Sequence, residues 1–409
     1  MILWIRPSIN IHRQWLFYPV HRMYLYFHER ILGSLIGDDS FALSFWNWDH
    51  PDAMSFPELF LSGPPFDDTQ RDPSHFPPCM VDLSFGGVEK SANSLSNSAD
   101  DAEMLRANLA LMYNQVVSAG KRTELFMGCP LRPSEDGFCD GIGTIESAPH
   151  NTVHTWVGSA ANPAREHMGA FYSAGWDPSF YPHHTNIDRL WEVWRDVHGI
   201  DIPIQDPVWL NSYFYFYDEN LKLVKIKVSD VLNITNLGYA YEKVDLLWLN
   251  QRPKPSVDPK IAKRELGKRH NNGLKSNAIG QNLSSPIRVK LYRPKRLRKN
   301  REKKEDEEEV LVVYGIDTKG DVDTMFKFDV YVNLVDETKL GPRYREFVGT
   351  FVHLPQKKSR ISSTLKLGIS EALEDLEADE EESIWVTLLP QTSSCESVTI
   401  TGIRIEYMK

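Results

Sequence analysis

The sequence has no apolar run of the roughly 20 residues that a membrane-spanning helix needs. The apolar stretch 1–5 is shorter than the hydrophobic part of a secretory signal, so we expect no targeting segment in the chain as given. Positive charge is in deficit, with a formal net charge of -10 at pH 7. Because phosphate binding needs a basic surface, this charge argues against nucleic acid as a partner and favours a small-molecule substrate.

Cysteine is also scarce, with four residues in the chain. Their spacings do not match a zinc ribbon or a thioredoxin-type motif. Cys129 and Cys139 are close enough in sequence to form a disulfide within one loop. Two free thiols are an equally good interpretation, because the compartment decides the redox state.

The first half of the chain has the pattern of a helical protein. Pro19 suits a first helical turn and Gly37 suits a helix end. The segment 38–98 is rich in Pro, Ser, Asp and Gly and predicts long ordered loops. From apolar periodicity we predict four helices, over residues 18–36, 102–118, about 150–157 and 181–197.

The second half changes to strand-like alternation. Residues 251–286 are poor in large apolar side chains and predict a linker. The basic run 290–304 is followed by the acidic block 305–309, which favours a solvated loop over a nucleic-acid site. We predict strands at 221–228, 309–316, 326–334, 345–354, 383–389 and 398–406. The fold class is therefore multi-domain α+β, a mainly helical bundle followed by an antiparallel β-sandwich or barrel.

Two groups of histidines suggest a metal site. His150 and His154 are four residues apart, so both rings project from one helix face. His183 and His184 follow at the start of another predicted helix, as in a bundle-core site. An all-imidazole site suits copper, zinc or iron. A zincin is disfavoured because its motif needs Glu after the first histidine, where this chain has Asn151.

Most other histidines fit ordinary structural roles. His28 follows His21 by seven residues, which is about 10.5 Å along a helix, too far to share one metal. We predict no metal for His28, His50, His75, His167, His198, His270 and His353.

Long motifs then resemble the plant polyphenol oxidases. The stretch "HRQWLFYPVHRMYLYFHERILGSLIGDDSFALSFWNWD" resembles the first copper region of that family, and "PHNTVHTW" with "FYSAGWDPSFYPHHTNIDRLW" resembles the second. "DPVWLNSYFYFYDEN" is similar to the family's DWL region and "KFDVYVN" to its C-terminal KFDV domain. The implied domains are a copper domain at 1–205, the DWL region at 206–250, the linker at 251–286 and the KFDV domain at 287–409.

The resemblance implies a copper oxidase. Family members hold two copper ions, each with three histidines, and use dioxygen to oxidise o-diphenols to o-quinones; some also hydroxylate monophenols. It implies a phenolic substrate and O2 as partners, no nucleic acid, no membrane span and a plastid location in the thylakoid lumen. It also implies that the C-terminal domain shields the copper site until the linker is cut.

The resemblance also assigns copper ligands, by matching positions in the motifs. His12 and His21 match the second and third ligands of the first copper, and His150, His154 and His184 match all three ligands of the second. The family's remaining first-site ligand lies upstream of the matching region. We therefore expect the first copper site of this chain to lack one histidine, and its activity to be in doubt.

Other site residues carry over with open alternatives. By resemblance, Glu146 holds a water near the second copper, Asn151 assists deprotonation of a monophenol and Phe171 caps the second copper and limits substrate entry. As alternatives, Glu146 could be a helix-start carboxylate, Asn151 a surface polar residue and Phe171 part of the core. His183 is expected beside the ligands, and Asp188 and Arg189 are expected to brace the ligand helix.

Two other functions compete with the enzyme. The chain could be a non-catalytic remnant that binds one copper at His150, His154 and His184. An oxygen carrier shares the paired-copper logic, although the DWL and KFDV regions disfavour it.

Overall fold

The computed structural model describes most of the chain, and the statements below concern those residues alone. The described ranges are 11–61, 63–64, 66, 68–86, 98–131, 133–134, 137–199, 205–269, 278–294, 307–318, 323–356 and 361–408. His270 and residues 295–306 of the predicted basic and acidic loop lie outside them.

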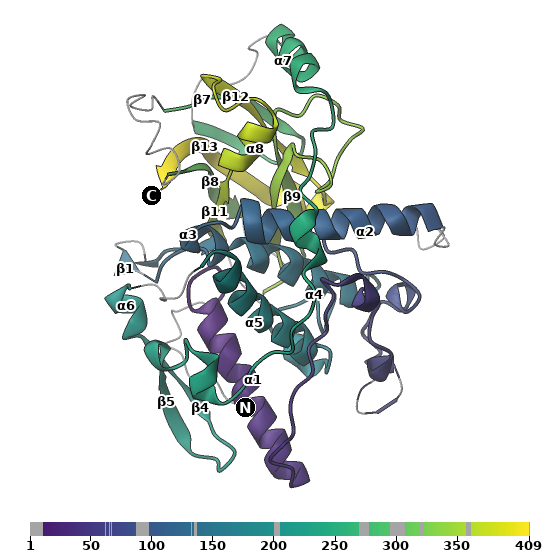
Figure 1. Cartoon of the computed structure of the whole chain (residues 1–409), viewed down its shortest axis with the longest axis vertical. Helices are drawn as coiled ribbons and strands as arrows, with labels where there is room; N and C mark the ends of the chain where they lie inside the picture. Colours follow the sequence, from purple (N-terminus) through teal and green to yellow (C-terminus); the bar gives the residue numbers. More distant parts are fainter. Residues whose placement is uncertain are drawn as a thin grey trace.

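The structure is mixed helix and sheet, as predicted, with a helical part below two sheets in Figure 1. The four predicted helices are confirmed, although residues 113–118 form a π-turn that continues α2. Gly37 ends α1 with a φ of 70°, which glycine adopts without a steric penalty. The α-helices are α1 Phe17–Ile36, α2 Ser98–Met112, α3 Thr123–Phe126, α4 Asn151–Val157, α5 Phe180–Val197, α6 Pro207–Leu210, α7 Pro259–Lys268 and α8 Ser370–Asp375.

Two sheets form the C-terminal part. A four-stranded sheet has the order β10-β9-β12-β7, and a five-stranded sheet has the order β3-β11-β8-β13-β6. Apolar side chains of both sheets share one core, so the arrangement is a sandwich. Their strands are β3 Gly141–Ile142, β6 Ala278–Asn282, β7 Ile287–Tyr292, β8 Glu308–Thr318, β9 Phe326–Val332, β10 Phe347–His353, β11 Ser362–Gly368, β12 Ser383–Pro390 and β13 Val398–Met408.

Two small hairpins stand apart from the sandwich. β4 (Tyr213–Tyr217) pairs with β5 (Leu223–Lys227). β5 lies within the strand predicted at 221–228, which is confirmed. β1 (Pro133–Ser134) pairs with β2 (Gly137–Phe138). In the described part of the chain, no helix is both long and apolar enough to cross a membrane.

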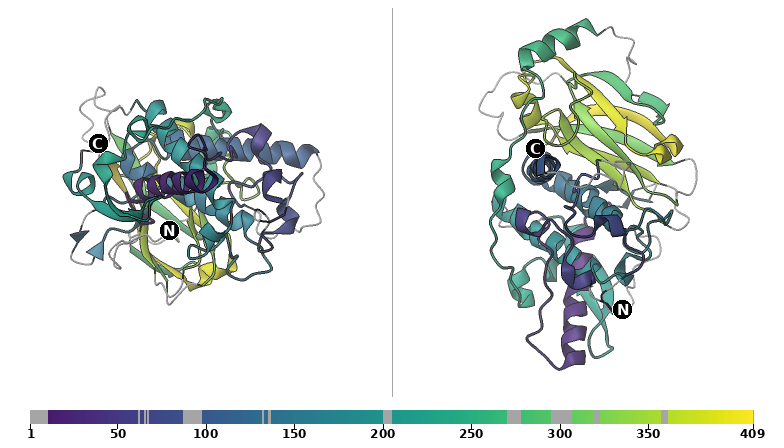
Figure 2. Two further views of the ribbon diagram at one scale, coloured as in Figure 1. Left: turned by 90° about the horizontal axis from the view of Figure 1, so that it is seen from below. Right: turned by 90° about the vertical axis from the view of Figure 1, so that its right-hand side faces the viewer.

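The two parts pack directly against each other. Tyr331, Phe347 and Val352 of the four-stranded sheet belong to the same apolar core as the helices. Figure 2 shows α2 end-on between the sheets and the other helices. Buried Arg345, beside β10, donates to Asn114 Oδ1 over 2.8 Å and to Ser118 Oγ over 2.9 Å in the π-turn after α2. These hydrogen bonds join the sheets to the π-turn, while the buried charge of Arg345 is paired with Glu371 and Asp375 of α8.

Some element predictions were incomplete. Residues 251–286 contain α7 and β6, so this segment is not wholly irregular. Strands β4, β7 and β11 were not predicted. The edge strand β3 comes from the helical half and pairs in parallel with β11, through Gly141 with Thr364 and Ile142 with Leu365. A two-residue strand that joins a distant sheet carries no periodicity, which is why sequence reasoning missed it.

Candidate metal centre

Three histidines from two helical segments meet in a buried site. His150 ends the π-turn that precedes α4, His154 lies one turn later on α4, and His184 lies near the start of α5. The Nε2 atom of His184 is 3.3 Å from Nε2 of His150 and 3.1 Å from Nε2 of His154. Nitrogen ligands about 2.0 to 2.1 Å from a tetrahedral metal lie about 3.3 Å from one another. The three imidazoles therefore fit one metal ion.

Hydrogen bonds orient two of these rings. His150 Nδ1 lies 2.8 Å from Asn151 Oδ1, and His154 Nδ1 lies 2.8 Å from the carbonyl oxygen of Met168. Each Nδ1–H donates to its oxygen, so each neutral ring keeps a lone pair on Nε2. The Nε2 atoms of His150 and His154, which carry these lone pairs, face Nε2 of His184. The partner oxygens thus select the tautomer that a metal needs.

The charge state of the rings also suits a metal. Burial lowers the pKa of His154 to about 4. Burial, together with the neighbouring histidines, lowers the pKa values of His150 and His184 well below the ordinary value. The rings are therefore neutral at pH 7, which is the form that binds a metal.

His183 is close to the three ligands but is held differently. All four ring systems offer nitrogens within 4.8 Å of one another. The Trp48 indole N–H donates to His183 Nδ1 over 3.1 Å. A neutral imidazole that accepts at Nδ1 carries its proton on Nε2. A proton on Nε2 would favour a neighbouring role for His183, which stays a prediction because its ring belongs to the same group of four histidines.

His12 and His21 lie beside this group. Their ring centroids are 5.2 Å apart, and the His21 ring stacks on His184 with centroids 4.5 Å apart. His21 Nδ1 lies 2.7 Å from the carbonyl oxygen of Phe17, so its Nε2 is the atom left for a metal. Burial lowers the pKa of His21 to about 4 and that of His12 well below its ordinary value. The structure thus brings both groups of predicted ligands together.

Glu146 is buried at the edge of the histidines. Its Oε1 accepts the backbone N–H of Arg13 over 2.8 Å, while Oε2 has no partner among the described residues. Burial raises the pKa of Glu146 to about 8. In the metal-free protein Glu146 is therefore mostly a neutral acid at pH 7, and its unpartnered oxygen can exchange a proton.

Asn151 and Phe171 occupy the boundary with the sheets. The Asn151 amide accepts from His150 and donates to the carbonyl oxygen of Val352 over 2.9 Å. The Phe171 ring lies nearest His12, with centroids 4.0 Å apart, and its backbone N–H donates to the carbonyl oxygen of Pro355 over 3.2 Å. Asn151 thus connects the histidines to β10 itself, and Phe171 connects them to the segment that follows β10.

Asp188 ties the two histidine groups together. It lies on α5 one turn after His184 and accepts from Arg22, the residue after His21, over 2.7 Å. The hydroxyls of Tyr239 and Tyr241 donate to its other oxygen over 2.7 and 2.6 Å. A buried carboxylate with three donors is well satisfied.

Arg189 makes a second buried network. It donates to Asp49 Oδ1 over 2.5 Å and to Asn186 Oδ1 over 2.8 Å. Trp248 donates to the other oxygen of Asp49 over 3.1 Å. Sequence reasoning missed Arg22, Asp49 and Trp248, because no short motif links partners so far apart.

The other histidines that were given structural roles have ordinary contacts. His28 stacks on Tyr181 with ring centroids 3.6 Å apart. His198 Nε2 lies 2.8 Å from the carbonyl oxygen of Val116, and His167 Nδ1 lies 2.8 Å from Asp68. His353 is buried and packs near Phe326.

Comparisons with known proteins give the family. Residues 3–197 match the common central domain of tyrosinase, 203–254 the polyphenol oxidase middle domain and 279–407 the chloroplastic polyphenol oxidase C-terminal domain. The chloroplastic polyphenol oxidase of Malus domestica is 42% identical and covers 98% of this chain, which spans 68% of that protein. The chain belongs to the plant polyphenol oxidase family. This is a family of oxidoreductases, and its tyrosinase-type domain implies copper as the metal.

Further relatives of the chain have varied names. Aureusidin synthase of Antirrhinum majus is 40% identical over 98% of the chain, which spans 70% of that protein. The (+)-larreatricin hydroxylase of Larrea tridentata is 41% identical, with coverage of 98% and 68%. The chain thus spans about two thirds of these curated relatives' length. Latent apple tyrosinase superposes with a TM-score of 0.85 at 40% identity, covering 98% of this chain and 84% of that one.

Proposed function

We propose that this protein oxidises o-diphenols to o-quinones with dioxygen at a pair of copper ions. The observation that carries the proposal is the set of three buried, neutral imidazoles whose Nε2 atoms lie 3.1 and 3.3 Å apart. His12 and His21 lie beside them, where a second ion would share the site. Overall, two catechols and one O2 give two quinones and two waters.

The chain's residues divide the work around the metal. When bound, the copper ions supply the electron acceptors and the site for dioxygen. His150, His154 and His184 would hold the second ion, and His12 with His21 would hold the first. Asp188 and Arg189 would keep α5 in place, so that His184 stays aligned.

Glu146 is the proposed proton acceptor for the phenol. Its unpartnered Oε2 is the buried oxygen available for that proton. Burial alone keeps Glu146 mostly protonated at pH 7, so it would accept the proton as a carboxylate, the form that the charge of bound copper ions would favour. Asn151 would orient His150, which is the contact its carboxamide makes. Phe171, packed on His12, would restrict substrate entry. Glu146 and Asn151 would also serve monophenol hydroxylation, which a monophenol assay tests separately.

We further propose that the sheets shield the site. Ser147, between Glu146 and His150, donates to the carbonyl oxygen of Thr350 over 2.7 Å and accepts from Val352 N–H over 3.1 Å. With the Asn151 contact to Val352, these bonds place β10 against the histidine segment. Cleavage within 251–286 followed by removal of the sheets should raise the rate of catechol oxidation. An unchanged rate would contradict shielding.

A second candidate function is a protein that binds one copper and does not turn over. It is favoured by the contrast between three converging imidazoles at the second position and two, His12 and His21, at the first among the described residues. Such a protein would bind about one copper per chain and form no quinone.

The deciding experiment measures copper per chain by elemental analysis and catechol oxidation on the same sample. Near two copper ions with quinone formation would support the oxidase, and catechol turnover would also exclude a pure oxygen carrier. One copper without turnover would overturn the oxidase in favour of the single-copper protein. His154→Ala should abolish second-site copper, whereas His28→Ala, whose ring stacks on Tyr181, is the matched control.

We propose a plastid location, in the thylakoid lumen. The support is that relatives such as the Malus domestica and Vitis vinifera proteins are named chloroplastic. Fractionation of plastids with an antibody to this chain tests the location.

A further inference from the structure

The segment that carries His12 is hydrogen-bonded to residues 128–129, the first of two chain segments that a disulfide links. Trp15 N–H donates to the carbonyl oxygen of Cys129 over 3.0 Å, and its indole N–H donates to the carbonyl oxygen of Gly128 over 2.8 Å. Gln14 forms a parallel bridge with Cys129. These bonds fix the backbone directly after His12 and Arg13.

The same segment is attached to residues 139–141, the second of the two linked segments. Gly141 N–H donates to the carbonyl oxygen of Arg13 over 2.9 Å, and the Arg13 guanidinium pairs with Asp140 at 2.8 Å. Asp140 in turn follows Cys139. We call residues 13–15, held between these two segments, the strap.

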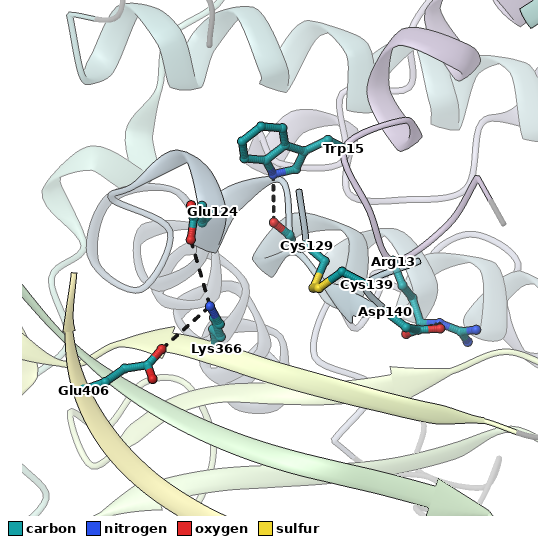
Figure 3. The surroundings of a disulfide bond; sticks show 9 residues. Arg13, Trp15, Glu124, Cys129, Cys139, Asp140, Lys366 and Glu406 are labelled. Atoms are coloured by element: carbon teal, nitrogen blue, oxygen red, sulfur yellow. Dashed lines mark hydrogen bonds and ion pairs between the residues drawn. A yellow bond between two sulfur atoms is a disulfide. The ribbon is translucent and has the colours of Figure 1, made fainter. Parts of the chain in front are cut away.

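A disulfide joins the two segments that hold the strap. Cys129 and Cys139 are bonded, with Cα atoms 5.7 Å apart, which decides between the two interpretations left open by the sequence. Figure 3 shows the disulfide, which lies between the side chains of the strap residues Trp15 and Arg13, with Asp140 beside Arg13. Of the two cysteines, Cys129 is buried and Cys139 is exposed.

The backbone beside the disulfide is closely packed at Gly141. A Cβ on Gly141 would lie 3.0 Å from Cys129 Sγ and 3.1 Å from the carbonyl oxygen of Thr364. Arg13 has a φ of 61°, a conformation that non-glycine residues adopt when surrounding contacts impose it. The strap is therefore in a conformation that depends on its neighbours.

Two site residues depend on the strap. His12 directly precedes it, and the Arg13 N–H that donates to Glu146 Oε1 belongs to it. A displacement of Arg13 would thus move a proposed first-site ligand and remove the hydrogen bond to the proposed proton acceptor. His154 and His184 take their positions from their own helices, α4 and α5.

We propose that the Cys129–Cys139 disulfide is a positioning device for His12, and through it for copper at the first site. This rests on the proposed function, in which His12 is a copper ligand. A dithiol reductant would supply two electrons and two protons, which cleave the S–S bond to two thiols while the reductant becomes a disulfide. The strap then loosens, and the first site loses copper while the second keeps it.

Hydrogen exchange of the metal-free protein tests, without any metal, whether the disulfide holds the strap in place. The amides of Trp15, Cys129 and Gly141 should exchange at least about tenfold faster after reduction with dithiothreitol, because the two segments that hold the strap are no longer joined. Amides of α4 should not change. Unchanged exchange at the strap would overturn the proposal, and so would an equal increase in α4, since the bond would then be a general stabiliser.

Copper binding tests the consequence for the site. The variant carrying Cys129→Ser and Cys139→Ser should lose the same copper equivalent that His12→Ala loses, with unchanged far-UV circular dichroism. Cys79→Ser, at a free cysteine, is the matched control. Parent-like copper binding in the double variant would overturn the proposal. If His12→Ala leaves the copper bound per chain unchanged, His12 is not a first-site ligand. The hydrogen-exchange result then still tests whether the disulfide holds the strap.

Discussion

The two positions for metal ligands are built in different ways. His150, His154 and His184 lie on or at the ends of helical segments packed in one core, and their Nε2 atoms already lie 3.1 and 3.3 Å apart. His21 lies on α1, whereas His12 lies on an irregular segment before it, fixed by hydrogen bonds to two chain segments that a disulfide links. Local helix geometry determines the first arrangement, and long-range contacts determine the second.

This difference decides how each position should respond to change. Helix-borne ligands keep their mutual spacing as long as the helices remain folded, because the backbone period fixes it. A ligand outside a helix, such as His12, keeps its position only while the distant residues that bond its segment keep theirs. The following variants test that contrast, beginning with the largest expected effect.

His184→Ala should break the second position. This ring is the one whose Nε2 approaches those of both His150 and His154. Loss of a ligand's outer partner already costs about 10- to 100-fold in metal affinity, so loss of the ligand should cost more than about 100-fold. Copper titration measures it, with His28→Ala as the control. Retained high-affinity copper would contradict the second site.

Arg22→Met should loosen the connection between the two positions. The Arg22 side chain is fully buried and binds Asp188, and removing one partner of a buried pair costs about 3–5 kcal/mol. Urea unfolding measures the free energy. Arg30→Ala is the control, because its partly exposed pair with Glu219 should contribute only about 0–1 kcal/mol. A loss below about 1 kcal/mol for Arg22→Met would show that this pair does not hold α1 to α5.

The stability of the metal-free protein should fall on both sides of neutral pH. His21 and His154, with pKa values of about 4, resist protonation when folded, so stability is lost as the pH falls from about 6.5 towards 4. Glu146, with a pKa of about 8, resists ionisation, so stability is lost as the pH rises from about 4.5 to 8.

Glu146→Gln should therefore flatten the alkaline side, and the variant should be more stable than the parent at pH 8 by on the order of a few kcal/mol. Thermal unfolding between pH 4 and 9 measures both limbs. An alkaline limb identical in the variant and the parent would assign that limb to another group.

Asn151→Ala should weaken the second position without removing a ligand. Loss of the hydrogen bond that orients His150 should reduce copper affinity by about 10- to 100-fold. Ser147→Ala is the matched control, because it removes a contact with the sheets but leaves His150 oriented. Equal losses of copper affinity in the two variants would mean that docking of the sheets, rather than ring orientation, explains the effect.

The sequence predicted the parts of this protein that depend on local periodicity. The four-residue spacing of His150 and His154 placed both on one helical segment, and Gly37 marked the end of α1. Strand alternation predicted most of the sandwich. The mixed α+β class and the family resemblance are confirmed.

What the sequence could not provide depends on distant partners. The bond between Arg22 and Asp188 joins residues 166 positions apart, and no motif announces it. The cysteine pairing was left open, because spacing alone does not determine a disulfide. The role of each site residue stays a prediction until copper binding is measured.

The edge strand β3 has a consequence for activation by proteolysis. It belongs to the chain before residues 251–286, yet it completes the five-stranded sheet by pairing with β11. A cut in that segment would therefore leave two fragments associated through backbone hydrogen bonds, like a split protein that remains assembled. Release would then follow the first-order kinetics of fragment dissociation rather than those of peptide cleavage. Nicked protein should co-elute on gel filtration as one species until those bonds are broken.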